Sequence, residues 1–123
     1  MRARLPRRLW HCAPRRASRP ETLPGSLRGG FHVNHFHPEG WLSSAYYVSV
    51  PVESADPVTR AGWLKFGEPR FPVDGLEPLA CVQPAPGRLV LFPSYLWHGT
   101  SPLKGEASRL SVAFDALPRA EIE

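Results

Sequence analysis

The chain has 123 residues and carries 15 Lys and Arg against 11 Asp and Glu, a formal net charge of +4. Seven arginines lie in residues 1–20, which contain no acidic residue, so residues 21–123 hold 8 basic and 11 acidic residues and a net charge of −3. This balance argues against a nucleic-acid-binding groove in the body of the chain, because such a groove needs a basic surface. No run of 18 apolar residues occurs, so no membrane-spanning helix is predicted.

Two cysteines, Cys12 and Cys81, stand 69 residues apart with no second cysteine near either. This excludes a disulfide scaffold and a zinc ribbon, and it favours a reducing compartment, so we expect a cytoplasmic location.

Residues 1–27 are rich in arginine and proline and contain few apolar residues, so we expect a disordered or irregular N-terminal extension there. Its first 20 residues, rich in arginine and free of acidic residues, also resemble a mitochondrial transit peptide, but the prolines of the segment oppose the amphipathic helix that such a peptide needs. The expected organisation is therefore this extension, one β domain over 28–118 and a C-terminal tail over 119–123.

From about Gly30 onward, prolines and glycines stand at the ends of short apolar or β-branched stretches. This pattern is typical of strands joined by turns. We expect strands over Gly30–Phe36, Leu42–Val52, Gly62–Phe66, Leu79–Gln83, Arg88–Phe92, Tyr95–Thr100 and Arg109–Ala116. Seven strands without a helical pattern predict an all-β sandwich or barrel.

Three histidines stand in contexts that suit metal binding. His35 and His37 are two residues apart, so on a strand both side chains lie on one face, within reach of one ion. His98 follows 61 residues after His37, in a separate predicted strand. Three imidazoles meeting inside a β-barrel would form a metal centre with open coordination positions. The alternative is a polar surface strand carrying H-x-H and a buried His98 bonded to a carbonyl group.

Arg109 begins the last predicted strand, where Arg109, Ser111 and Ala113 alternate with apolar residues. Either face of this strand could point inward. An inward arginine needs an anion, because an unpaired buried charge is costly. A dicarboxylate that chelates the metal at one end and meets Arg109 at the other would satisfy it, with Ser111 donating a further hydrogen bond. The alternative is an arginine at the strand edge in solvent or in a structural salt bridge.

The H-x-H pair is followed by AYYVSVP, GWLKFGEP, PGRLVLFPSYLWHGTSP and RLSVAFDA, in that order. Over about Gly29 to Ala116, this arrangement resembles the 2-oxoglutarate/Fe(II)-dependent oxygenases, in particular the group often found behind tetratricopeptide repeats in bacterial proteins. The resemblance implies a double-stranded β-helix, or jelly roll, which agrees with the predicted strands.

The resemblance also implies an Fe(II)- and 2-oxoglutarate-dependent dioxygenase of the hydroxylase type. Such an enzyme couples the oxidative decarboxylation of 2-oxoglutarate by O₂ to the oxidation of a substrate, unknown here, and ascorbate supports its activity. The residues implied for this site are His35, His37 and His98 as catalytic metal ligands, Arg109 and Ser111 for the far carboxylate of 2-oxoglutarate, and Tyr47 for a hydrogen bond to the cosubstrate.

One departure from the wider superfamily concerns the third ligand. Most members have H-x-D or H-x-E where this chain has His35-Phe36-His37, and three neutral histidines suit Zn(II) as well as Fe(II). Glu39 offers an alternative triad with His37 and His98, although Pro38 makes that register less natural. We expect the three histidines to be the ligands.

Two other functions stand beside the oxygenase. The chain could be a truncated or degenerate jelly-roll module that binds a metal or small molecule without turnover. A basic-tailed nucleic-acid-binding barrel is disfavoured, because the body lacks basic residues interleaved with aromatic ones. The expected partners are therefore small molecules, neither membrane nor nucleic acid, together with a homodimer that covers the outer sheet.

Overall fold

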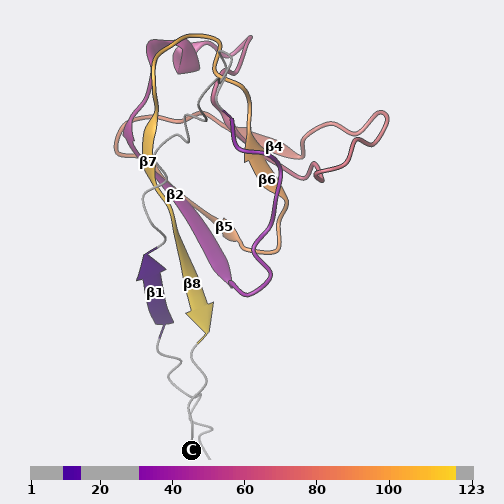
Figure 1. Ribbon diagram of the computed structural model, residues 1–123, viewed down its shortest axis with the longest axis vertical. Coiled ribbons are helices and arrows are strands. Elements are labelled where there is room, and N and C mark those ends of the chain that lie inside the picture. Colours follow the sequence, from indigo (N-terminus) through magenta and orange to yellow (C-terminus); the bar gives the residue numbers. More distant parts are fainter. Residues whose placement is uncertain (1–9, 15–30, 119–123) are drawn as a thin grey trace, which may run out of the picture.

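The computed structural model describes residues 10–14 and 31–118, and over these residues the fold is all-β (Figure 1). The described elements are strands β1 (Trp10–Pro14), β2 (Leu42–Ser49), β3 (Leu64–Phe66), β4 (Ala80–Val82), β5 (Leu89–Pro93), β6 (His98–Thr100), β7 (Leu110–Val112) and β8 (Phe114–Pro118), and one 3₁₀ turn, η1 (Val52–Ala55). Among these residues, no helix has the length and apolar character needed to cross a membrane.

The strands form two antiparallel sheets that give a jelly-roll-like fold, as predicted. The larger sheet has the order β1-β8-β2-β5, with β7 also paired to β2, and the smaller sheet has the order β4-β3-β6. Leu64 and Phe66 of the smaller sheet pack against Phe92 of the larger one to form the buried core. The Phe66 and Phe92 rings meet edge to face with their centroids 5.0 Å apart, so aromatic packing joins the two layers.

The predicted strand over Gly30–Phe36 is wrong for the residues that the structure describes. Residues 31–36 run beside β6 and form only an isolated bridge, between His35 and His98. The His32 carbonyl accepts a hydrogen bond from Thr100 N, and His35 pairs with His98. Two residues lie between His32 and His35, but only one lies between His98 and Thr100. The extra residue interrupts the ladder, as in a β-bulge, and a sequence pattern cannot show it.

The predicted strand over Arg109–Ala116 is split into β7 and β8. Ser44 Oγ accepts a hydrogen bond from Phe114 N at 3.0 Å and donates one to the Phe114 carbonyl at 2.8 Å. The hydroxyl thus takes the place of main-chain pairing at the break, and both strands pair with β2 on either side of it.

Strand β1 lies within the N-terminal extension and pairs with β8 over Trp10–Pro14. The sequence pattern did not predict this strand, because its partner is 100 or more residues away. The remaining predictions for residues 1–27, and the tail over 119–123, fall on residues outside those described.

Side chains on β2 and β7 alternate between the two faces of the larger sheet. Tyr47 is buried, and Arg109 and Ser111 are half-buried, whereas Leu110 and Val112 are exposed, so Arg109 and Ser111 occupy the inward face. The outer face of β2, β5 and β7 carries seven exposed apolar side chains: Leu42, Tyr46, Val48, Leu89, Leu91, Leu110 and Val112. The homodimer that would cover this face stays a prediction.

Candidate metal centre

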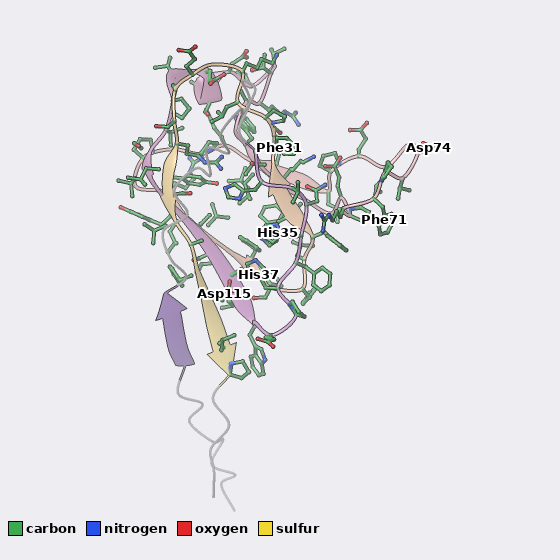
Figure 2. All side chains as sticks on the ribbon, in the orientation of Figure 1. Phe31, His35, His37, Phe71, Asp74 and Asp115 are labelled. Atoms are coloured by element: carbon green, nitrogen blue, oxygen red, sulfur yellow. The ribbon has the colours of Figure 1, made fainter. Side chains whose placement is uncertain are left out.

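The structure brings His35, His37 and His98 together, with His98 buried and the other two half-buried. Each offers one ring nitrogen as a ligand atom, and these atoms all lie within 4.8 Å of one another. The ring centroids of His35 and His98 are 4.3 Å apart, and that of His37 is 5.0 Å from each. Figure 2 shows His35 and His37 between their own segment and the larger sheet. One divalent ion can therefore reach all three imidazoles.

Main-chain hydrogen bonds between distant segments create this cluster. His35 and His98 exchange both of their main-chain hydrogen bonds, each at 2.9 Å, which fixes the H-x-H segment beside β6. The His37 amide donates to the Ser94 carbonyl at 2.8 Å, in the turn between β5 and β6. The same turn thus positions His37 and leads directly into His98.

Every histidine of the cluster has its Nδ1 atom next to an oxygen acceptor. The His35 Nδ1 lies 2.8 Å from the Val33 carbonyl oxygen, and the His98 Nδ1 lies 2.9 Å from that of Leu96. Because a carbonyl can only accept, both Nδ1 atoms must carry the hydrogen, which leaves the Nε2 lone pair free in the neutral ring. This arrangement is the usual one for histidines that bind a metal through Nε2, so the residues fit a divalent metal ion.

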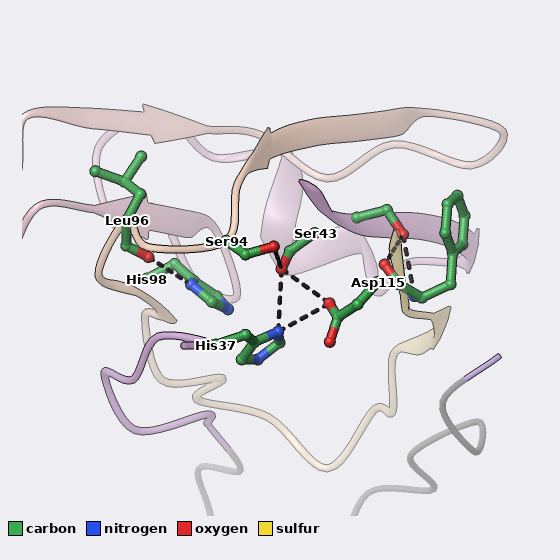
Figure 3. Close-up of polar contacts among 8 residues, drawn as sticks. His37, Ser43, Ser94, Leu96, His98 and Asp115 are labelled. Atoms are coloured by element: carbon green, nitrogen blue, oxygen red, sulfur yellow. Dashed lines mark hydrogen bonds and ion pairs between the residues drawn. The ribbon is translucent and has the colours of Figure 1, made fainter. Parts of the chain in front are cut away.

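His37 differs, because its Nδ1 partner is a carboxylate. The His37 Nδ1 lies 2.8 Å from Asp115 Oδ1, and Ser43 Oγ donates to the same oxygen at 2.8 Å (Figure 3). Ser94 Oγ lies 2.9 Å from Ser43 Oγ. Asp115 and both serines are buried, so this network is shielded from water.

Burial also keeps His98 neutral. His98 is only 6% exposed, and this burial lowers its pKa to about 4. The hydrogen bond to the Leu96 carbonyl raises the pKa, but its effect is weaker. A neutral imidazole near pH 7 has its lone pair available without prior loss of a proton.

Glu39, the alternative third ligand, lies in the turn after His37 and is exposed. Among the described residues, the group that could hold a metal consists of the three histidines, and Glu39 is not part of it. Glu39 thus lies outside this group, and its role as an alternative third ligand stays a prediction.

Arg109, Tyr47 and Ser111 gather at a second position on the inward face. Tyr47 is opposite Ser111 in the register of β2 and β7, and the Arg109 guanidinium lies over the Tyr47 ring, 5.9 Å from its centroid. Burial raises the pKa of the Tyr47 phenol, an effect that the charge of Arg109 partly offsets. Burial lowers the pKa of Arg109, an effect that the charge of Tyr47 partly offsets.

The Arg109 guanidinium can donate several hydrogen bonds. Arg109 Nη1 donates to the Gly62 carbonyl at 2.6 Å, whereas a guanidinium carries five N–H donors in all. Within residues 31–118, the ion pairs join His37 to Asp115 and Lys65 to Glu68, so none of the described carboxylates pairs with Arg109. An inward cation without an acidic partner is suited to binding an anion.

The two positions are separated along one strand. Ser43, which contacts His37, and Tyr47, which supports Arg109, are inward residues of β2 four positions apart, so they are about 13 Å apart along the strand. The inward residue between them is Ala45, which packs against the hydrophobic core. The histidine cluster and Arg109 therefore lie beside different parts of the same strand.

Sequence reasoning missed Asp115, although a signal for it exists. In the alternating pattern, Asp115 falls on the same face as Arg109 and Ser111, and it stands between apolar residues. An acid at an inward position of a strand needs a buried partner.

Comparison with known proteins gives the family. No curated protein matches the chain. A family model described as "Putative 2OG-Fe(II) oxygenase" matches residues 25–115, which is about three quarters of the chain and includes all three histidines and Arg109. The chain therefore belongs to this family of 2OG-Fe(II) oxygenases.

Proposed function

We propose that this protein is an Fe(II)- and 2-oxoglutarate-dependent dioxygenase of the hydroxylase type. The observation that carries the proposal is the combination of three convergent histidines with an inward arginine that pairs with none of the described carboxylates. Family membership supports the same class of chemistry.

His35, His37 and His98 would hold the metal through Nε2, and their Nδ1 partners would fix the orientation of each ring. Bound Fe(II) would supply the reaction with O₂, in which 2-oxoglutarate is converted to succinate and CO₂ while a substrate is oxidised. The role of the protein is to position the reactants and to limit access of water, and the burial of His98 serves both purposes.

Arg109 would bind the far carboxylate of 2-oxoglutarate. Its guanidinium is already oriented by the Gly62 carbonyl and the Tyr47 ring, so little side-chain entropy is lost when the anion binds. Ser111 lies beside Tyr47 on the same face and could donate a further hydrogen bond to this carboxylate. The fork geometry of arginine suits such bidentate binding.

A metal-binding module without turnover is the second candidate. One observation favours it: the donor set consists of three neutral histidines, which bind Zn(II) as readily as Fe(II). The two candidates differ in whether 2-oxoglutarate joins the metal at this site.

The test is an anaerobic titration of purified protein with Fe(II) and 2-oxoglutarate, followed by a succinate assay in air with ascorbate. The oxygenase should give a visible charge-transfer band and slow succinate formation even without substrate. Arg109→Ala should raise the 2-oxoglutarate concentration for half-maximal absorbance by about 10- to 100-fold, because it removes charge-assisted hydrogen bonds. Arg70→Ala, at an exposed loop residue, is the matched control and should leave it unchanged. Metal binding without the band would support the second candidate instead.

A further inference from the structure

The buried carboxylate of Asp115 is the feature that the proposed function leaves unexplained. Asp115 is 5% exposed and occupies an inward position of β8, where an isolated charge would be strongly unfavourable. Its Oδ1 atom accepts hydrogen bonds from both His37 Nδ1 and Ser43 Oγ, each at 2.8 Å. The fold thus retains a buried acid and directs it at one metal-binding histidine.

The three histidines are not equivalent in this respect. His35 and His98 donate to main-chain carbonyl groups, which are neutral, whereas His37 donates to a carboxylate. A carboxylate partner makes the opposite ring nitrogen a stronger ligand, because it stabilises positive charge on the imidazole. His37 is therefore expected to be the strongest ligand of the three.

The charge of a bound metal ion is a second reason to assign Asp115 a role at this site. Among the described residues, the ligand group contains no carboxylate, so a divalent ion held there would keep its full charge in a partly buried site. The Asp115 carboxylate is one imidazole ring away from that ion, in contact with His37 Nδ1. It is close enough to compensate the charge without occupying a coordination position.

The surrounding network holds Asp115 in place. Ser43 Oγ has a single hydrogen, so when it donates to Asp115 it can accept the hydrogen of Ser94 Oγ, 2.9 Å away. Ser43 is 1% exposed and Ser94 is completely buried. Gly40 makes room for this network, because a Cβ atom there would lie 2.5 Å from Ser94 Oγ.

We propose that Asp115 is a positioning residue for the metal ligand His37 and supplies the negative charge that the all-histidine ligand set lacks. This inference rests on the proposed metal centre, and it assigns to Asp115 an effect on metal affinity that acts through the His37 ring.

The experiment compares wild type, Asp115→Asn and Asp74→Asn by Zn(II) titration under identical conditions. Asparagine can still accept the His37 hydrogen bond but has no charge, and Asp74 lies at the exposed tip of a distant loop (Figure 2). Asp115→Asn should weaken Zn(II) binding by about 10- to 100-fold, whereas Asp74→Asn should match wild type. Equal affinity of folded Asp115→Asn and wild type would overturn the inference.

A second measurement needs only the wild-type protein, in case Asp115→Asn does not fold. In the Zn(II) form, proton NMR should show ring N–H resonances from the three histidines, with that of His37 furthest downfield because its acceptor is charged. A His37 resonance at the same position as those of His35 and His98 would overturn the inference. Failure of wild type to bind Zn(II) or Fe(II) at all would instead refute the metal centre itself, so the two failures are distinguishable.

Discussion

Replacing Gly99 by alanine tests how closely the H-x-H segment packs on β6. Gly99 lies between His98 and Thr100, and its outward side is covered by residues 32–34. A Cβ atom at Gly99 would lie 2.9 Å from the His32 carbonyl oxygen and 3.1 Å from the Asn34 amide nitrogen, and it would overlap Asn34 Oδ1. Main-chain atoms are involved, so a side-chain rotation alone cannot relieve the contact.

The size of the effect follows from these distances. The His32 carbonyl must retreat by about 0.4 Å to reach an ordinary carbon–oxygen contact of about 3.3 Å. That carbonyl accepts a hydrogen bond from Thr100 N at 3.0 Å, which the movement would stretch. We expect Gly99→Ala to lower the free energy of unfolding by about 1–3 kcal/mol, the usual range for overpacking.

Metal affinity should also fall, because His35 is only three residues beyond His32. Metal–ligand distances tolerate about 0.2 Å, less than the expected shift, so we predict at least about a tenfold loss of Zn(II) affinity. Urea unfolding and Zn(II) titration measure the two quantities. Gly75→Ala is the control: Gly75 has a φ of +73° and no atoms within 4 Å of an added Cβ, so it should lose about 1 kcal/mol of stability without loss of metal affinity. If Gly99→Ala binds Zn(II) as tightly as the Gly75 control, the packing argument is refuted.

Two further predictions concern the inward and outward faces of the larger sheet. Tyr47→Phe keeps the ring under Arg109 but removes the hydroxyl, so a loss of 2-oxoglutarate affinity would support a hydrogen bond from Tyr47 to the cosubstrate. Tyr47→Leu should weaken 2-oxoglutarate binding by up to about tenfold whether or not that hydrogen bond exists, because the cation–π contact with Arg109 is lost. Leu91→Lys places a charge on the exposed apolar face of the larger sheet and should dissociate a homodimer formed through that face, with little change in the stability of the fold. Sedimentation of wild type and Leu91→Lys measures the oligomeric state. If both proteins sediment as monomers, the predicted dimer is refuted.

The local sequence predicted the strands best where their own pattern decides the structure. The stretch Leu42–Val52 alternates and contains β2, and Arg88–Phe92 follows a Pro-Gly turn and contains most of β5. Elements that depend on a distant partner were missed or misjudged. Strand β1 exists through pairing with β8, and residues 31–36 fail to form a strand because an extra residue interrupts their pairing with His98–Thr100.

For the site, the spacing of His35 and His37 and the separate His98 identified the candidate ligands, but could not exclude Glu39. The cluster depends on main-chain bonds from His35 to His98 and from His37 to Ser94, which join residues about 60 positions apart. Whether Arg109 faced inward was also undecided, because both faces of its strand were plausible. The structure places Leu110 and Val112 outside and Arg109 inside.

By itself, the sequence determined an all-β domain and the identity of the residues that could bind a metal and an anion, because side-chain chemistry and alternation are local properties. Only the tertiary structure decided that Asp115 lies against His37, because these two residues are 78 positions apart. Their hydrogen bond requires the pairing of β8 with β2 and the main-chain bond that holds His37 at the turn before β6. The seven N-terminal arginines give the sequence its net positive charge, whereas the one basic residue that the sequence predicted in the site is Arg109.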